Sequence, residues 1–123
     1  MQISLLRAKL HQARVTHADI NYVGSITIGT NLLAQVGMVP FERVLVADIE
    51  NGERFETYII PGESDRVIQV NGAAARLVNI GDRLIVMAFA LVECPPPANW
   101  SPQVVVLDEA NNVKSIEMHG RYG

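Results

Sequence analysis

Short apolar segments alternate with turn residues along most of the chain. Eight of them are expected as strands, at residues 14–22, 25–28, 44–49, 55–60, 66–70, 84–92, 103–107 and 113–118. Segments of this length, bounded by Gly, Pro and Asn, are typical of an all-β domain. Asn51-Gly52 predicts a tight hairpin between two of these strands, because both residues accept a positive φ. Residues 84–92 are nine uncharged apolar residues and predict a buried central strand.

Two short helices are expected among the strands. Thr30 is a candidate N-cap and Gly37 a candidate C-cap, which together predict a helix over residues 30–37. Residues 73–77 are rich in alanine and predict one helical turn directly after an Asn-Gly turn. Both helices are too short to form a layer of their own, so the strands must build the core.

The apolar composition is dominated by β-branched residues, with 15 Val and 11 Ile against 10 Leu. Stiff β-branched side chains fit a pleated sheet and favour strands. A chain of 123 residues can bury a single core without disulfides, and the sequence contains no internal repeat. We therefore predict one domain over residues 1–123, mainly β, closed into a barrel with short helices.

Charge and cysteine content exclude several classes of protein. The net charge of −3 disfavours nucleic-acid binding, and the longest apolar run is far shorter than the about 20 residues of a membrane helix. The first residues place Arg7 and Lys9 among too few apolar residues for a signal peptide, so a cytoplasmic location is expected. Cys94 is the one cysteine, and the three histidines lack ligand spacing around it, so no metal site is expected.

Two familiar site motifs fit the sequence poorly. Residues 48–52 resemble a calcium loop, but the glycine comes one residue early and the hairpin explains the segment better. Ser25, His17 and Asp19 supply the residue types of a catalytic triad, although no nucleophile elbow surrounds the serine. Composition and common motifs therefore leave the function open.

Five short blocks, in a fixed order, are the informative feature. They are Lys-Leu-His at residues 9–11, Thr-His-Ala-Asp at 16–19, Tyr-Val-Gly-Ser at 22–25, Asn-Gly-Glu-Arg-Phe-Glu-Thr-Tyr at 51–58 and Asn-Gly-Ala-Ala-Ala at 71–75. Together they resemble the aspartate 1-decarboxylase family, the pyruvoyl-dependent enzymes that make β-alanine for pantothenate, a precursor of coenzyme A. The resemblance extends from residue 1 to about residue 118. It implies a double-psi β-barrel, a homotetramer with sites between subunits, and self-cleavage between Gly24 and Ser25.

The chemistry of Gly24 and Ser25 agrees with that implied cleavage. Glycine leaves its carbonyl open to attack, and the Ser25 hydroxyl lies next to it in the chain, so attack converts the amide into an ester. β-Elimination then releases residues 1–24 and leaves dehydroalanine at the start of residues 25–123, which hydrolyses to a pyruvoyl group with loss of ammonia. By resemblance, Thr57 stabilises the oxyanion, a contribution of about 2.7–4 kcal/mol in comparable sites.

The resemblance also implies roles in turnover. A pyruvoyl group binds the amine of L-aspartate as a Schiff base and accepts electrons as CO2 leaves, as pyridoxal phosphate does. Arg54 suits one substrate carboxylate because guanidinium binds carboxylate bidentately, and Lys9 assists. Tyr58 is the implied proton donor to the α-carbon.

The implied substrate contacts are wider than these catalytic groups. They comprise Lys9, Arg54, Thr57, Asn71, Gly72, Ala73 and Ala74, with Tyr22 and His11 lining the pocket. Without the resemblance, Tyr58 is typical of a half-buried strand residue and Arg54 of a surface charge. His11 stays open between a structural role and the pocket.

A small β-barrel that only binds a ligand is the alternative class. Such a module stays whole, whereas a decarboxylase of this family yields fragments of 24 and 99 residues, so intact mass separates the two classes. The resemblance leaves open whether cleavage is spontaneous or assisted by a helper protein.

Overall fold

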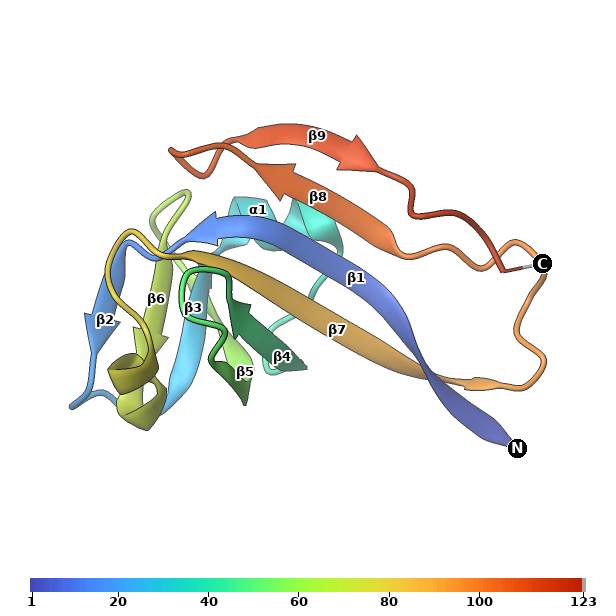
Figure 1. Ribbon diagram of the computed structural model, residues 1–123, viewed down its shortest axis with the longest axis horizontal. Coiled ribbons are helices and arrows are strands. Elements are labelled where there is room, and N and C mark those ends of the chain that lie inside the picture. The colour runs from blue at the N-terminus through green and yellow to red at the C-terminus, as the bar shows by residue number, and fades with distance from the viewer. Residues whose placement is uncertain (123) are drawn as a thin grey trace.

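The structure is a computed structural model that describes residues 1–122 and consists mostly of strands (Figure 1). Its elements are β1 (Gln2–Arg14), β2 (His17–Asp19), β3 (Ser25–Gly29), α1 (Thr30–Val36), β4 (Arg43–Asp48), β5 (Arg54–Gly62), β6 (Ile68–Asn71), the 3-10 helix η1 (Gly72–Leu77), β7 (Arg83–Glu93), β8 (Gln103–Leu107) and β9 (Val113–Glu117). Within the described residues the strands form one mixed sheet in the order β2-β6-β3-β5-β4-β7-β1-β8-β9. The predicted mainly β architecture of the double-psi barrel type, with short helices, is confirmed.

Strand pairing is antiparallel in some places and parallel in others. β1 and β7 run side by side through much of the molecule as an antiparallel pair, and β8 lies parallel to β1 on its other side (Figure 1). β3 is flanked by antiparallel β6 and parallel β5. Parallel neighbours require crossover connections, so strands distant in sequence become adjacent in space.

The core is built from alternate positions of these strands. On β1, Ala8 and Leu10 are fully buried, and on β7 the positions Leu84 and Val86 are fully buried as well. Side chains alternate between the two faces of a strand, so one face supplies the core. Burying each large aliphatic side chain stabilises the fold by about 1.5–3 kcal/mol.

The chain begins with a strand where the sequence pattern predicted none. The expected strand over residues 14–22 is wrong, because β1 occupies Gln2–Arg14 and the short β2 occupies His17–Asp19. Polar Lys9 and His11 alternate with buried residues in β1, and this alternation is the period of a half-buried strand.

The expectation of a buried central strand over residues 84–92 is correct only in part. β7 lies in the interior of the strand order, but Phe89 and Leu91 near its end are 42% and 71% exposed. Apolar composition alone does not distinguish a core position from an exposed apolar face, since both use the same residues.

The turn and cap residues of the sequence predict most of the local structure that is observed. β4 and β5 form the predicted antiparallel hairpin, and Gly52 has φ 76°. A hydrogen bond from the Asp48 amide to the Glu53 carbonyl at 2.9 Å closes the hairpin, so its turn is longer than two residues. Helix α1 ends at the predicted C-cap, Gly37, but Thr30 lies inside the helix rather than at its N-cap. No helix in residues 1–122 is long and apolar enough to cross a membrane.

Candidate active site

Ser25 is a buried polar residue at the first position of β3. It is 1% exposed, and the antiparallel register places it opposite Asn71, the last residue of β6, which is equally buried. The Asn71 Nδ2 donates to Ser25 Oγ at 3.0 Å. A buried hydroxyl needs such a partner, so the end of β6 determines where the Ser25 side chain lies.

Two further polar residues extend this contact. Asn71 Nδ2 also donates to Thr27 Oγ1 at 3.1 Å, and Gln69 Nε2 donates to Asn71 Oδ1 at 2.8 Å. Gln69 and Thr27 are missing from the site predicted from sequence. Their signal in the sequence is the two-residue spacing from Asn71 and Ser25, which puts each pair on one face of its strand.

Gly72 packs directly against the backbone of Gly24. Its φ is +74°, and a Cβ at this position would lie 2.7 Å from Gly24 Cα and 3.3 Å from the carbonyl oxygen of Tyr22. Both the conformation and the close approach require glycine here. Gly24 itself has room, since a Cβ there would find its nearest atom, the Asn71 carbonyl oxygen, at 4.0 Å.

β5 places Tyr58 beside Ser25. The parallel register pairs Ile26 with Ile59, so Ser25 and Tyr58 come one residue earlier on neighbouring strands. Both isoleucines are fully buried, so Ser25 and Tyr58 lie on the opposite face of the sheet from the core. Tyr58 is 38% exposed, which leaves its ring accessible from outside the chain.

Thr57 and Arg54 lie on β5 but further from Ser25. Thr57 is paired with the buried Val44, and its side chain leaves the strand on the face opposite to that of Tyr58. Arg54 shares the face of Tyr58 at the start of the strand and is exposed, about 13 Å away along the strand.

Lys9 and His11 do not converge with Ser25 within the chain. They occupy β1, which β7 and β4 separate from β5, and three strand spacings amount to about 14 Å. Burial, and next the charge of Lys9, hold the pKa of His11 below its ordinary value of 6.5. The His11 Nδ1 is buried and has no hydrogen-bond partner among residues 1–122.

Of the predicted turn residues, Ala73 and Ala74 follow Gly72 within η1, which begins at Gly72. Ala73 is exposed and Ala74 is half-buried. A separate pocket of about 310 Å³ is lined in part by Tyr22, Thr27 and Gln69, and its lining includes neither Ala73 nor Ala74. Tyr22, which the sequence predicted as pocket-lining, is 49% exposed and lines this pocket.

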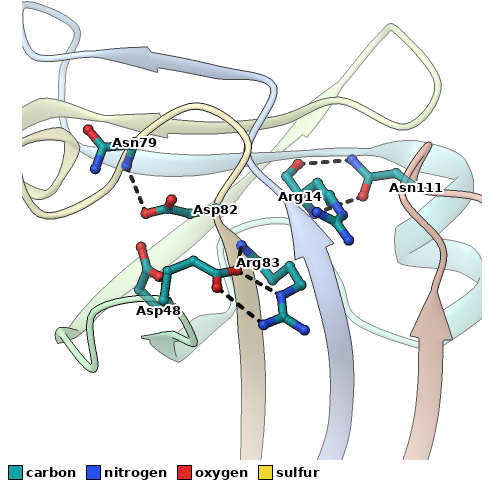
Figure 2. Close-up of polar contacts among 7 residues, drawn as sticks. Arg14, Asp48, Asn79, Asp82, Arg83 and Asn111 are labelled. Atoms are coloured by element: carbon teal, nitrogen blue, oxygen red, sulfur yellow. Dashed lines mark hydrogen bonds and ion pairs between the residues drawn. The ribbon is translucent and has the colours of Figure 1, made fainter.

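A second polar cluster lies at the other end of the β4–β5 hairpin. Figure 2 shows the Asp48 carboxyl facing that of Asp82, while Arg83 Nε donates to Glu50 Oε2 at 2.7 Å. Burial first, and the neighbouring carboxyl of Asp82 second, raise the pKa of Asp48 to about 6. The Arg83 guanidinium lowers the pKa of the exposed Glu50 to about 2. This cluster joins the hairpin to the start of β7 and is separate from Ser25.

Comparison with known proteins identifies the class and then the family. A family model described as "Aspartate decarboxylase" matches residues 1–114. The chain is 47% identical over 125 residues to the aspartate 1-decarboxylase of Carboxydothermus hydrogenoformans, with 98% of each chain covered. It is 50% identical over 121 residues to that of Chlorobium chlorochromatii, covering 98% of this chain and 94% of the relative. These matches show that the chain is an enzyme, a lyase of the decarboxylase class. Within that class it belongs to the aspartate decarboxylase family.

Proposed function

We propose that this enzyme cleaves itself between Gly24 and Ser25 and then, with a pyruvoyl group derived from Ser25, converts L-aspartate to β-alanine and CO2. The main support is the buried Ser25 hydroxyl, held at 3.0 Å by Asn71 directly after a glycine whose backbone packs on Gly72. The β-alanine serves pantothenate synthesis in this proposal. The cytoplasmic location remains an expectation from the sequence.

The proposed cleavage begins with groups that the chain itself supplies. Ser25 Oγ loses its proton and attacks the Gly24 carbonyl carbon, the C–N bond breaks, and the nitrogen of residue 25 takes up a proton to become a free amine. β-Elimination then removes the Cα proton of residue 25, breaks the Cβ–O bond and releases the Gly24 carboxylate. Water then replaces the nitrogen of the resulting dehydroalanine, and ammonia leaves. The Asn71 amide, already within hydrogen-bond distance of Ser25 Oγ, stabilises negative charge that develops on this oxygen.

Residues around Ser25 suit a pyruvoyl group at this position. Asn71 and Thr27 offer polar atoms beside it. Gly72 packs so closely on Gly24, the residue before Ser25, that a side chain at position 72 has no room. When formed, the group supplies an electron sink for the electrons that CO2 leaves behind. Tyr58, in the adjacent register position, gives its hydroxyl proton to the α-carbon.

The remaining roles carry over from the family resemblance. Arg54, assisted by Lys9, holds a substrate carboxylate, and Ala73 and Ala74 complete the substrate contacts. The resemblance also assigns the oxyanion donor to Thr57, but within one chain its side chain leaves β5 on the face opposite to Ser25, so the geometry of a single chain does not support this role. His11 and Tyr22 line the pocket.

We also propose that the active site forms between subunits of a homotetramer. Lys9 and His11 lie about 14 Å across the sheet from β5, so they do not adjoin Tyr58 of the same chain. Large apolar side chains are exposed, among them Phe41 at 73% and Leu91 at 71%, which favours burial against other copies. Sedimentation at micromolar concentration tests this assembly, and fully active monomers would contradict it.

The decisive test of the proposed function is Ser25→Ala. We expect the wild-type chain to give fragments of residues 1–24 and 25–123, whereas Ser25→Ala folds but stays whole and forms no β-alanine. Ser4→Ala, which removes an exposed hydroxyl on β1, is the matched control and should cleave normally. Intact mass and β-alanine formation are measured together. A 24-residue fragment from Ser25→Ala, or a wild-type chain that stays whole, contradicts the proposal, and the second result favours a binding module.

A further inference from the structure

We propose that Gln69 is a positioning residue for the cleavage between Gly24 and Ser25, because its side-chain amide orients that of Asn71 toward the Ser25 hydroxyl. This inference rests on the proposed function. Gln69 is absent from the site that the sequence predicted, and it reaches Ser25 only through Asn71.

The strand register brings four polar side chains together in a two-by-two block. β6 contributes Gln69 and Asn71, and antiparallel β3 places Thr27 opposite Gln69 and Ser25 opposite Asn71. The intervening Val70 is fully buried in the core, so the four polar side chains lie on the other face of this strand pair.

The hydrogen bonds in this block have a defined direction. Gln69 Nε2 donates to Asn71 Oδ1 at 2.8 Å, and this occupies the only acceptor atom of the Asn71 side chain. Both protons of Asn71 Nδ2 therefore go to hydroxyls, one to Ser25 Oγ at 3.0 Å and one to Thr27 Oγ1 at 3.1 Å. The Ser25 oxygen accepts, so its own proton is free to leave during attack.

An asparagine amide has nearly the same shape after a rotation of 180°, so its neighbours decide which end faces Ser25. If Asn71 turned over, Oδ1 would face Ser25 Oγ, hold the hydroxyl proton and repel the charge that develops on that oxygen. Ser25 and Asn71 are each 1% exposed, so water has little access to replace a lost donor. Gln69 therefore acts on the cleavage rate by setting the direction of the Asn71 amide.

Three substitutions of similar length separate polarity from packing. Gln69→Lys keeps a donor toward Asn71, Gln69→Leu removes it, and Gln69→Glu replaces it with an acceptor that favours the reversed amide. Gln69 is only partly buried at the edge of a pocket, so these changes leave the core intact. The rate of appearance of the 24-residue fragment is followed by intact mass, and the melting midpoint of each uncleaved chain is measured.

We expect the cleavage rate of Gln69→Lys to lie within a few-fold of the wild-type rate. The rate of Gln69→Leu should be about tenfold lower than wild type, and that of Gln69→Glu about a hundredfold lower. Acidification should restore part of the Gln69→Glu rate relative to wild type, because the introduced carboxyl becomes a donor when protonated. A purely structural role would not produce this order or this pH profile. Gln2→Glu, an exposed glutamine on β1, is the control and should cleave as wild type does.

The outcomes distinguish the two proposals. If the wild-type chain cleaves and Gln69→Glu cleaves equally fast, the positioning role is wrong while the proposed function stands. Equal slowing of Gln69→Lys and Gln69→Glu also overturns it, because packing rather than donor direction would then matter. A wild-type chain that never cleaves overturns the proposed function and the positioning role with it.

Discussion

Asp48 is a buried carboxyl whose neutralisation should stabilise the protein at neutral pH. Its side chain is 1% exposed and faces Asp82 (Figure 2). Asp48 Oδ1 accepts from the Glu50 amide at 2.8 Å, whereas Oδ2 has no partner in the part of the chain that the structure describes. Two carboxylates repel each other, and they form a hydrogen bond only when one of them carries a proton.

The sign of the pH dependence follows from the pKa of Asp48. Burial and Asp82 raise it from 3.8 to about 6. Between these values the native state keeps a proton that the unfolded state has released. The free energy of unfolding therefore falls as pH rises from about 4 to about 6, and stays lower above that range. At about 1.4 kcal/mol per pH unit, ionising Asp48 costs the native state up to about 3 kcal/mol at neutral pH.

Asp48→Asn removes this cost without changing the shape of the side chain. The amide keeps an acceptor for Glu50 and can place its NH2 toward Asp82. We expect the free energy of unfolding to rise by about 2–3 kcal/mol at pH 7.5 and to change by less than about 0.5 kcal/mol at pH 4. Asp108→Asn is the control, and its free energy of unfolding should change in the opposite direction. Backbone amide hydrogen bonds from Asn112 and Ala110 lower the pKa of Asp108, so its charged form stabilises the native state. That variant should be destabilised at neutral pH.

Urea unfolding between pH 4 and pH 8 measures these differences. All variants carry Ser25→Ala, so that each remains one chain, and all are compared at one protein concentration because assembly shifts apparent stability. Asp82, Glu50 and Arg83 surround Asp48 and are unchanged in every variant, so the difference reports Asp48. An Asp48→Asn chain that is less stable than its parent at pH 7.5, or a gain that does not depend on pH, would refute the reasoning.

Two further predictions concern the proposed site. Gly72→Ala should slow cleavage and lower the melting midpoint, because the new Cβ would overlap Gly24 Cα. A left-handed alanine costs a further about 1–2 kcal/mol. Gly37→Ala is the control, because Gly37 has a similar φ but open space around it, so this variant carries only the backbone cost. Equal effects of the two variants would show that the contact with Gly24 is unimportant. Tyr58→Phe should cleave normally but form β-alanine about 10²–10⁴-fold more slowly per cleaved chain, and activity within a few-fold of wild type would exclude Tyr58 as the proton donor.

Local structure and the identity of the family were available from the sequence alone. The β4–β5 hairpin follows from Asn51-Gly52, and the end of α1 follows from Gly37, because these residues act on the backbone within a few positions. The order of short blocks likewise predicted the family that the comparisons establish, since the motifs of a family are short runs of consecutive residues.

Only the tertiary structure decided which of these residues meet. Asn71 contacts Ser25 from 46 positions away because β6 pairs with β3, and the same pairing brings Gln69 to the site. Lys9 and His11 are separated from β5 by two intervening strands, although they belong to the same predicted site. Hydrophobic periodicity determines which face of a strand is buried, but the partner and register of that strand depend on packing across the whole barrel.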